Sequence, residues 1–416
     1  MYDWANSVYS LVISTVIFPI YYETVTKNET GTEVSFLGSQ FENTVLYNYI
    51  IAASYLAIAL LSPYFAAMAD RTGRKKVFMR SFMTVGAVAC MGMFFFDERT
   101  VHLGLALAFL ASIGFSGSIV FYNAFLPVIA PKELHDSLSA RGFALGYLGS
   151  ALLLIISLVL IQFPAVFGFS NEGVATKFTF ALTGFWWLGF GLISISKLPK
   201  DEVKDYFESK LFRKAWKELF LVLHEFSKMG QLRRFLSAFF WYSTGMQTVI
   251  LIAGVFGAKV LGMETTQLIL VILTIQFVAI IGAYAFAWFS AKTSNITTII
   301  VGVSMWMLLC LAAYFVTENY QFYSVAGLLG FAMGAVQSIS RSTYSKMLPK
   351  TDDPTTYFSF YDVIEKLAIT VGMASVALVE GLTGSLRNST LALSFFFVLG
   401  LIQLTRLSIF QQKTSV

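Results

Sequence analysis

The sequence predicts an all-α integral membrane protein with twelve transmembrane helices. Of its 416 residues, 56% are hydrophobic and only 13% are charged, and the mean hydropathy is +0.70. An ordinary soluble domain carries about 25% charged residues. The apolar residues are grouped in runs of about 20 or more, the length that crosses a hydrocarbon core of about 30 Å. Because these runs are continuous rather than alternating, they exclude a transmembrane β-barrel.

The twelve runs divide six and six. The first six occupy Trp4–Val25, Thr44–Ala69, Val77–Phe96, Leu103–Ile129, Ser139–Val166 and Ala175–Ile195. The second six occupy Phe235–Phe256, Thr266–Ser290, Ile296–Val316, Phe322–Met347, Tyr357–Glu380 and Thr390–Phe410. We expect the first run to be an uncleaved helix, because it lacks the basic region and cleavage site of a signal peptide. It begins directly against Met1, so a short lead-in is expected to precede it in the native chain.

A charged stretch separates the two sets of spans. Lys200 to Lys228 alternates charged and apolar residues at helical spacing, which predicts an amphipathic helix on the membrane surface or against the base of the bundle. A soluble arm that binds a partner protein is the alternative. We therefore expect an N-terminal six-helix bundle (residues 1–196), an amphipathic cytoplasmic linker (197–234) and a C-terminal six-helix bundle (235–416).

The distribution of basic residues predicts the orientation. With the N-terminus inside, only five Lys and Arg residues fall in the outer loops: Lys27, Arg99, Lys177, Lys259 and Arg387. Most of the others lie in the short inner loops and the linker, so both termini are expected in the cytoplasm. The net charge of +5 is therefore no sign of nucleic-acid binding. We expect a multi-pass protein of a bacterial inner or plasma membrane, with a vacuolar-type membrane as the weaker alternative.

The two halves share a short sequence pattern at corresponding positions. Ala130-Pro131-Lys132 precedes the fifth span, and Leu348-Pro349-Lys350 precedes the eleventh at the corresponding position. Two parallel six-helix halves joined by a polar linker resemble the major facilitator superfamily, in which the substrate site lies near the midplane between the halves. The resemblance implies that the first, fourth, seventh and tenth spans line the cavity, which makes Trp241 and Gln247 candidate lining residues.

The turn between the second and third spans is similar to a motif of that superfamily. Ala66 to Lys76 contains Ala-Asp-Arg-Thr-Gly-Arg-Lys, in which a glycine permits a tight turn beside a basic cluster. The resemblance implies that Asp70, Arg71, Gly73 and Arg74 take part in closing the cytoplasmic gate; the alternative is a simple basic anchor. The corresponding turn of the second half, Ala291 to Asn295, does not match this motif. Any contact that closes the cytoplasmic gate is therefore expected to be asymmetric between the two halves.

More specific stretches occur in both halves. They are Tyr2–Ser7, Phe18–Tyr22, Tyr122–Pro127, Arg141–Ser150 and Gln337–Ser342. They resemble the poorly characterised branch of the superfamily that is related to autophagy-linked vacuolar amino-acid effluxers, which implies an amino-acid-like solute. From them we take Asn123 and Gln337 as candidate substrate or coupling residues and Arg141 as a candidate gating residue. In the seventh-span signature, Thr244 stands where some members have an acidic residue.

The first span carries a polar stripe. Asp3, Asn6, Ser7, Ser10 and Ser14 recur at spacings of three or four, which places them on one face of a helix. A stripe of this kind is unfavourable against lipid. We expect it to line a cavity, and hydrogen bonding between helices is the competing interpretation.

The eleventh span contains three ionisable residues, Asp362, Glu365 and Lys366. Lys366 is expected about 13 Å below the membrane surface, where each charge costs roughly 2.5–3.5 kcal/mol or more. Asp362 precedes Lys366 by four positions, the favourable order for a helical ion pair. Glu365 then needs another cation, and Arg341 in the tenth span is the nearest candidate. The group could be a static network, or it could bind a proton and a substrate with both charge signs.

We therefore predict a secondary active transporter that moves a small solute by alternating access, with proton coupling as the favoured hypothesis. A drug or metabolite efflux transporter of the same fold and a non-transporting solute sensor are the alternatives. A membrane enzyme is disfavoured because His102, His135 and His224 form no paired motif. We expect a monomer whose partners are its substrate, protons and the lipid bilayer, with no nucleic acid, cofactor or metal.

Overall fold

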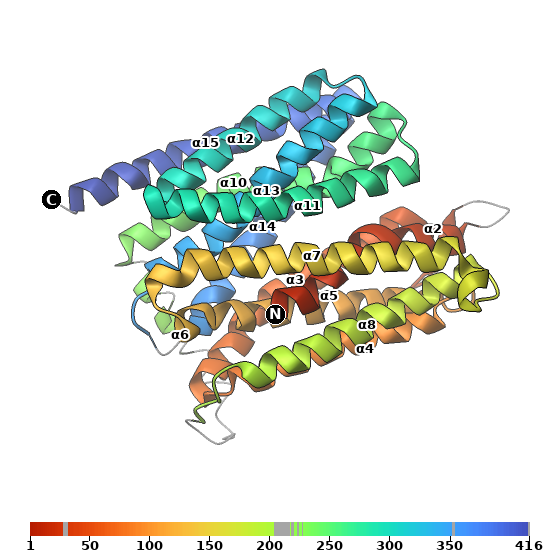
Figure 1. Cartoon of the computed structure of the whole chain (residues 1–416), viewed down its shortest axis with the longest axis horizontal. Helices are drawn as coiled ribbons and strands as arrows, with labels where there is room; N and C mark the ends of the chain where they lie inside the picture. Colours follow the sequence, from red (N-terminus) through yellow and green to blue (C-terminus); the bar gives the residue numbers. More distant parts are fainter. Residues whose placement is uncertain are drawn as a thin grey trace. The chain divides into compact units, whose positions relative to one another are not determined.

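The computed structural model describes residues 1–27, 32–203, 217, 220–222, 224–226, 228–351 and 354–414. Within them the chain is almost entirely helical (Figure 1), apart from an antiparallel hairpin of β1 (Glu33–Phe36) and β2 (Ser39–Glu42). Eleven helical stretches among these residues are long and apolar enough to cross a membrane. The twelfth, α14 (Pro354–Thr383), has the length but carries Asp362, Glu365 and Lys366. The predicted all-α membrane fold is confirmed.

The chain packs as two compact units, Met1–Tyr122 with Leu148–Tyr206, and Asn123–Tyr147 with Phe207–Val416. In this grouping, Asn123–Tyr147 packs with the second unit rather than with the rest of the first half of the chain. Most of the predicted amphipathic helix at Lys200–Lys228, including Phe207, Leu211, Ala215, Leu219 and Leu223, lies outside the described residues.

The first unit contains the elements of the first half. They are α1 (Tyr2–Val8), η1 (Tyr9–Ile17), α2 (Phe18–Thr26), α3 (Asn43–Thr72), α4 (Lys75–Gly92), η2 (Met93–Phe95), most of α5 (Val101–Ala124), the second part of α7 (His135–Gln162), η4 (Pro164–Phe167) and α8 (Glu172–Lys197). Helix α8 packs on α4 and α1. Trp187 of α8 is fully buried, with its ring 5.6 Å from that of Tyr9.

Two spans of the first half of the chain differ from their predicted form. The first span is not a continuous α-helix, because Tyr9–Ile17 forms a π-helix; nothing in the sequence pattern indicated this. The fifth span begins at Lys132, seven residues before the predicted Ser139, and ends at Gln162 rather than Val166. Its end has a clear cause, because Pro164 cannot continue the helical hydrogen bonding.

The second unit is built mainly from the helices of the second half. They are α6 (Leu126–Ile129), η3 (Lys132–Leu134), the first part of α7, α10 (Gly230–Leu261), α11 (Thr265–Lys292), α12 (Asn295–Phe315), α13 (Asn319–Met347), α14 and α15 (Leu386–Thr414). Helix α13 packs on α11 and α12, and α10 packs on α14 and α15. Gly334 allows α13 to approach α11 closely, since a Cβ there would lie 2.0 Å from the Ala279 carbonyl oxygen.

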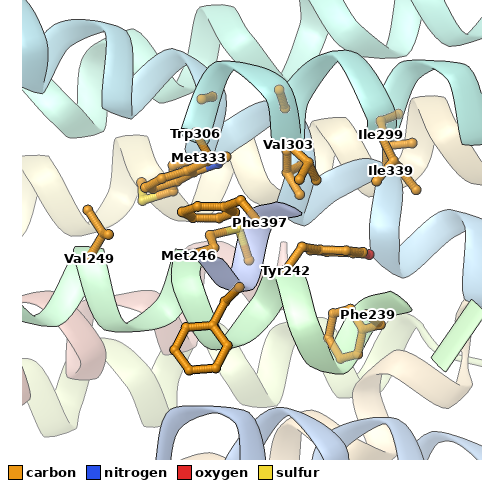
Figure 2. Packing of buried hydrophobic residues seen from close by; sticks show 14 of the residues in the cluster. Phe239, Tyr242, Met246, Val249, Ile299, Val303, Trp306, Met333, Ile339 and Phe397 are labelled. Atoms are coloured by element: carbon orange, nitrogen blue, oxygen red, sulfur yellow. The ribbon is translucent and has the colours of Figure 1, made fainter. Parts of the chain in front are cut away.

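A large apolar core holds the second unit together. Figure 2 shows Tyr242 and Met246 of α10 facing Phe397 of α15, with Val303 and Trp306 of α12 on the other side. The rings of Trp306 and Phe397 stack with their centres 6.1 Å apart. Burying aromatic side chains of this size contributes more than any other residue type to a core, so α10 is held firmly. That matters because α10 also carries residues of the candidate site.

Candidate functional site

Glu365 of α14 contacts α10, and Asp362 and Lys366 of the same helix form a buried ion pair beside it. Lys366 Nζ is 3.1 Å from Asp362 Oδ1, and the two side chains are only 10% and 5% exposed. This is the ion pair that the spacing of four predicts. Glu365 is half-buried, and its Oε1 accepts a hydrogen bond of 2.7 Å from Gln247 Nε2 of α10. The candidate residues Gln247, Asp362, Glu365 and Lys366 are therefore brought together.

The close fit of α10 and α14 fixes this geometry. A Cβ at Gly372 would lie 1.8 Å from Thr248 Oγ1 and 2.8 Å from the Thr244 carbonyl oxygen. Only glycine permits that approach. About three turns nearer the start of α14, the rings of Phe239 and Tyr361 stack with their centres 4.2 Å apart. The two helices therefore hold Gln247 and Glu365 at hydrogen-bond distance without a flexible loop between them.

One oxygen of this group stands out. Asp362 Oδ2 is buried and accepts no hydrogen bond from any residue that the structure describes. An ionised carboxylate with an unsatisfied buried oxygen is costly, typically about 1–3 kcal/mol or more. Such an oxygen is a natural acceptor for a proton or a ligand group. The sequence favoured Glu365 for that role, and Asp362 Oδ2 offers a second acceptor in the same group.

Arg341 has a different environment from the one predicted. Its Nε and one terminal nitrogen each donate a hydrogen bond of 3.0 Å to Ser139, to the hydroxyl and the carbonyl oxygen respectively. The other terminal nitrogen lies 3.4 Å from Asn123 Oδ1, and the guanidinium sits over the ring of Phe143 at 4.3 Å. The sequence pointed to Arg341 as the cation for Glu365, but the hydrogen bond of Glu365 goes to Gln247. Spacing along one helix predicted the ion pair of Asp362 and Lys366. A pair between Glu365 and Arg341, in contrast, depended on how α13 faces its neighbours.

Three other candidate residues belong to the second unit, on α13, α10 and α7. Gln337 accepts a 2.7 Å hydrogen bond from the Tyr147 hydroxyl. Trp241 is half-buried, with its ring stacked 6.1 Å from that of Phe396. Arg141 is exposed on α7. Asn123 and Gln337 therefore each form a hydrogen bond between α13 and the Asn123–Tyr147 segment. Trp241 contacts α15 instead.

A polar network that the sequence did not indicate holds the start of α7. Asp136 accepts hydrogen bonds from Lys346 Nζ at 2.6 Å, Asn295 Nδ2 at 2.7 Å and Ser290 Oγ at 2.8 Å. Lys346 Nζ also donates to Asn295 Oδ1 at 3.0 Å. Asn295 belongs to the turn between α11 and α12 that looked degenerate, so this turn does bind charged residues. We call Asp136, Ser290, Asn295 and Lys346 the Asp136 network.

A sequence signal for this network exists but is weak. Asp136 stands in the first turn of a helix that follows a proline, and Lys346 stands in the last turn of α13. Both positions suit ordinary charges near helix ends. The combination of three separate helices around one carboxylate cannot be derived from such local features.

In the first unit, Asp3 and Asn6 are buried and Ser10 is exposed. The Tyr122 hydroxyl donates a short hydrogen bond to the Asp3 carboxylate. Val12, in contrast, is fully buried. The polar side of this span is thus accessible at Ser10, while its apolar side is packed inside the protein. The π-helix begins at Tyr9, so the regular stripe predicted from a 3.6-residue period does not continue past that point.

The turn between α3 and α4 has the predicted geometry. Gly73 ends α3 with a φ of +65°, a left-handed conformation that favours glycine. Asp70 is buried and its Oδ1 lies 3.2 Å from Lys75 Nζ. Lys76 reaches the end of α8, donating to the Leu198 carbonyl oxygen at 3.0 Å. Arg71 and Arg74, the other predicted gating residues, are both half-buried in the same turn.

Comparisons with known proteins agree over the full chain. The sequence model of the family described as "Vacuole effluxer Atg22 like" matches residues 1–415. An uncharacterized MFS-type transporter of Bacillus subtilis, YxiO, is 30% identical over 97% of this chain and 92% of its own length. Autophagy-related protein 22-1 of Aspergillus clavatus is 22% identical, over 86% of this chain and 72% of its own.

Solved structures show the same fold. The major facilitator transporter FucP in its outward conformation aligns with a TM-score of 0.69 at 14% identity, covering 98% of this chain and 96% of its own. The human organic anion transporter MFSD10 also gives 0.69 at 14% identity, covering 97% and 98%. At this identity the likeness establishes the twelve-helix fold, and the chemistry has to be derived from the residues of this chain.

Proposed function

The chain belongs to the vacuole effluxer Atg22-like family of major facilitator transporters, and on that premise we propose that it carries a small, zwitterionic, amino-acid-like solute by alternating access. The observation that carries this proposal is the group of opposite charges on one membrane-spanning helix, Asp362, Glu365 and Lys366. Ionisable residues inside a membrane protein mark substrate or ion pathways. A solute with an ammonium and a carboxylate would find partners of both signs here.

Each residue has a proposed role. Lys366 binds the solute carboxylate, exchanging part of its contact with Asp362 for a second charge-assisted hydrogen bond. Glu365 binds the solute ammonium, and Gln247 orients the Glu365 carboxylate by its hydrogen bond. A purely static network is the competing interpretation. The unsatisfied Asp362 oxygen favours the ligand-binding interpretation, because most buried acceptors in a folded protein have a donor.

Coupling to protons follows from the same geometry. When Lys366 turns to the solute, Asp362 loses its only described partner and becomes a buried carboxylate with two free oxygens. A proton is the partner proposed for these oxygens, because burying an unpaired charge is unfavourable. Proton uptake and solute binding are thereby linked at one residue. Glu365 and Asp3 are the other carboxylates whose substitution is needed to test this link between proton uptake and solute binding.

The Asp136 network is proposed to control the conformational step. It holds Asn123–Tyr147 against α11, α12 and α13 in the described conformation. Alternating access requires such contacts to break and re-form. Charge-assisted hydrogen bonds make the docked position of this segment lower in free energy than the undocked one. Asp70, Arg71, Gly73 and Arg74, with Arg141, remain proposed gating residues.

A binding experiment with purified protein tests the substrate proposal. Thermal stability is measured against amino acids, peptides and sugars, and then flux into proteoliposomes is measured for any solute that stabilises the protein. Lys366→Gln should remove the stabilisation, whereas Lys259→Gln should not, because Lys259 is 64% exposed in a surface ion pair with Glu380. Stabilisation by a sugar alone, or equal loss in both variants, contradicts the proposal. Binding without flux would indicate a solute sensor instead of a transporter.

The membrane topology is proposed from the basic residues. Both termini are placed in the cytoplasm of a cell whose plasma membrane holds the protein, and the protein acts as a monomer with two six-helix halves (residues 1–196 and 235–416) joined by a cytoplasmic linker. Single cysteines introduced in place of Arg99 and Lys200 give the test in intact cells. An impermeant maleimide should label the position of Arg99 from outside and should not reach that of Lys200.

A further inference from the structure

The first unit has an open groove on its surface, of about 570 Å³, between α4 and α5. Arg80, Ser81 and Thr84 form its polar lining, and Val85, Val88, Leu107 and Leu110 are among its apolar lining residues. Val88 is 53% exposed and Leu110 is 41% exposed. In a protein that spans a membrane, exposed apolar side chains of this kind face acyl chains.

The two helices that line the groove also approach each other closely. A Cβ at Gly114 of α5 would lie 2.4 Å from the backbone nitrogen of Gly86 of α4. The two backbones are therefore almost in contact at this point, which fixes α4 and α5 against each other beside the groove.

Arg80 gives the groove a charged end. It lies five residues after the start of α4, which places it about 7.5 Å along the helix axis from Lys75. The headgroup region on each side of a bilayer is about 5–8 Å thick, so Arg80 reaches the level where phosphates meet acyl chains. Within the described part of the chain, Arg80 has no hydrogen bond or ion pair. A guanidinium at that depth needs an anion.

The neighbouring basic residues are engaged elsewhere. Lys75 is paired with Asp70, and Lys76 donates to the Leu198 carbonyl oxygen at the end of α8. Arg80 is the remaining basic side chain of the first two turns of α4. Its exposed guanidinium is thus available to an external partner, and the apolar groove begins directly beside it.

We propose that this groove is a binding site for an anionic phospholipid. The phosphodiester accepts a bidentate pair of hydrogen bonds from Arg80, a geometry that matches a guanidinium and not an ammonium. One acyl chain lies along Val88, Leu107 and Leu110. The lining of α4 from Arg80 to Ala89 covers about 13 Å, close to the depth of one leaflet of the hydrocarbon core, about 15 Å.

The test compares lipid retention in matched variants of the full chain. Purified protein is mixed with phosphatidylglycerol or phosphatidylcholine, and bound lipid is counted by native mass spectrometry alongside thermal stability. We expect phosphatidylglycerol to bind and stabilise the wild type, and Arg80→Gln to weaken that binding by about tenfold. Arg99→Gln, which removes an exposed basic residue from an outer loop of the same unit, should bind as the wild type does.

Two further variants keep the result interpretable. Val88→Trp fills the groove without changing charge and should also reduce phosphatidylglycerol binding, while Arg80→Lys should show an intermediate loss. If Arg80→Gln and Val88→Trp both retain phosphatidylglycerol as the wild type does, the site does not exist. Equal binding of phosphatidylcholine and phosphatidylglycerol, or an equal loss in Arg99→Gln, would show only general lipid or surface-charge effects and would overturn the proposal.

Discussion

Neutralising Asp136 should release the segment Asn123–Tyr147 from α11–α13. The Asp136 side chain is 11% exposed and that of Lys346 is 25% exposed, so the pair is partly shielded from water. Removing one partner of a fully buried ion pair costs about 3–5 kcal/mol, and the partial exposure lowers that figure. We expect about 2 kcal/mol for Asp136→Asn, which corresponds to roughly a thirtyfold change in the docked-to-undocked ratio.

A cysteine at position 140 would report this change. Ala140 lies in the same segment and is 1% exposed, so Ala140→Cys should react with a maleimide only when the segment opens. Cys90 and Cys310 are buried and contribute little background. In the Asp136→Asn background the labelling rate of this cysteine should rise by roughly thirtyfold.

The controls decide whether the network is responsible. Lys346→Gln should raise the rate similarly, and the double variant should raise it less than the product of the two single effects, because both remove one interaction. Asp97→Asn serves as the matched control; Asp97 is an exposed loop carboxylate whose pKa is lowered chiefly by the backbone N–H of Arg99. Unchanged labelling in both single variants, or fully multiplicative effects, would refute the reasoning.

Three further predictions concern the site and the packing. Lys366→Gln should weaken solute binding by at least about tenfold, measured by ligand-induced thermal stabilisation. Asp362→Asn should remove the pH dependence of proteoliposome uptake, whereas Asp362→Glu should keep it. If Asp362→Asn, Glu365→Gln and Asp3→Asn all leave that pH dependence unchanged, proton coupling through these carboxylates is ruled out. Gly114→Ala should destabilise the protein by about 1–3 kcal/mol, seen as a lower melting temperature, whereas Gly189→Ala, where a Cβ meets nothing within 4 Å, should melt as the wild type does.

The sequence was sufficient for the architecture because lipid imposes a simple rule. Apolar runs of about 20 residues have to be helices, so most predicted spans match the observed helices to within a few residues. The ion pair of Asp362 and Lys366 was predictable for a similar reason, since four residues along a helix place two side chains on one face. In both cases a local pattern determined the outcome.

Long-range polar contacts could not be predicted in this way. Glu365 meets Gln247 because α10 and α14 approach closely at Gly372, and nothing near Glu365 in the sequence records that approach. Asp136 is bound by residues from the ends of three other helices. The partner of a buried charge depends on how helices face one another, which local periodicity does not determine.

The π-helix at Tyr9–Ile17 changes the phase of the first span. One residue of an α-helix corresponds to a rotation of roughly 100°, so converting a single wide turn to ordinary α-helical bonding would rotate Phe18 against Asp3 by about that angle. The same conversion would lengthen the span by about 1.5 Å, the rise of one residue. A screw-like motion of this kind would turn Ser10 and Ser14 to a new direction and would change the ring contacts of Phe18 with Phe96 and Phe180.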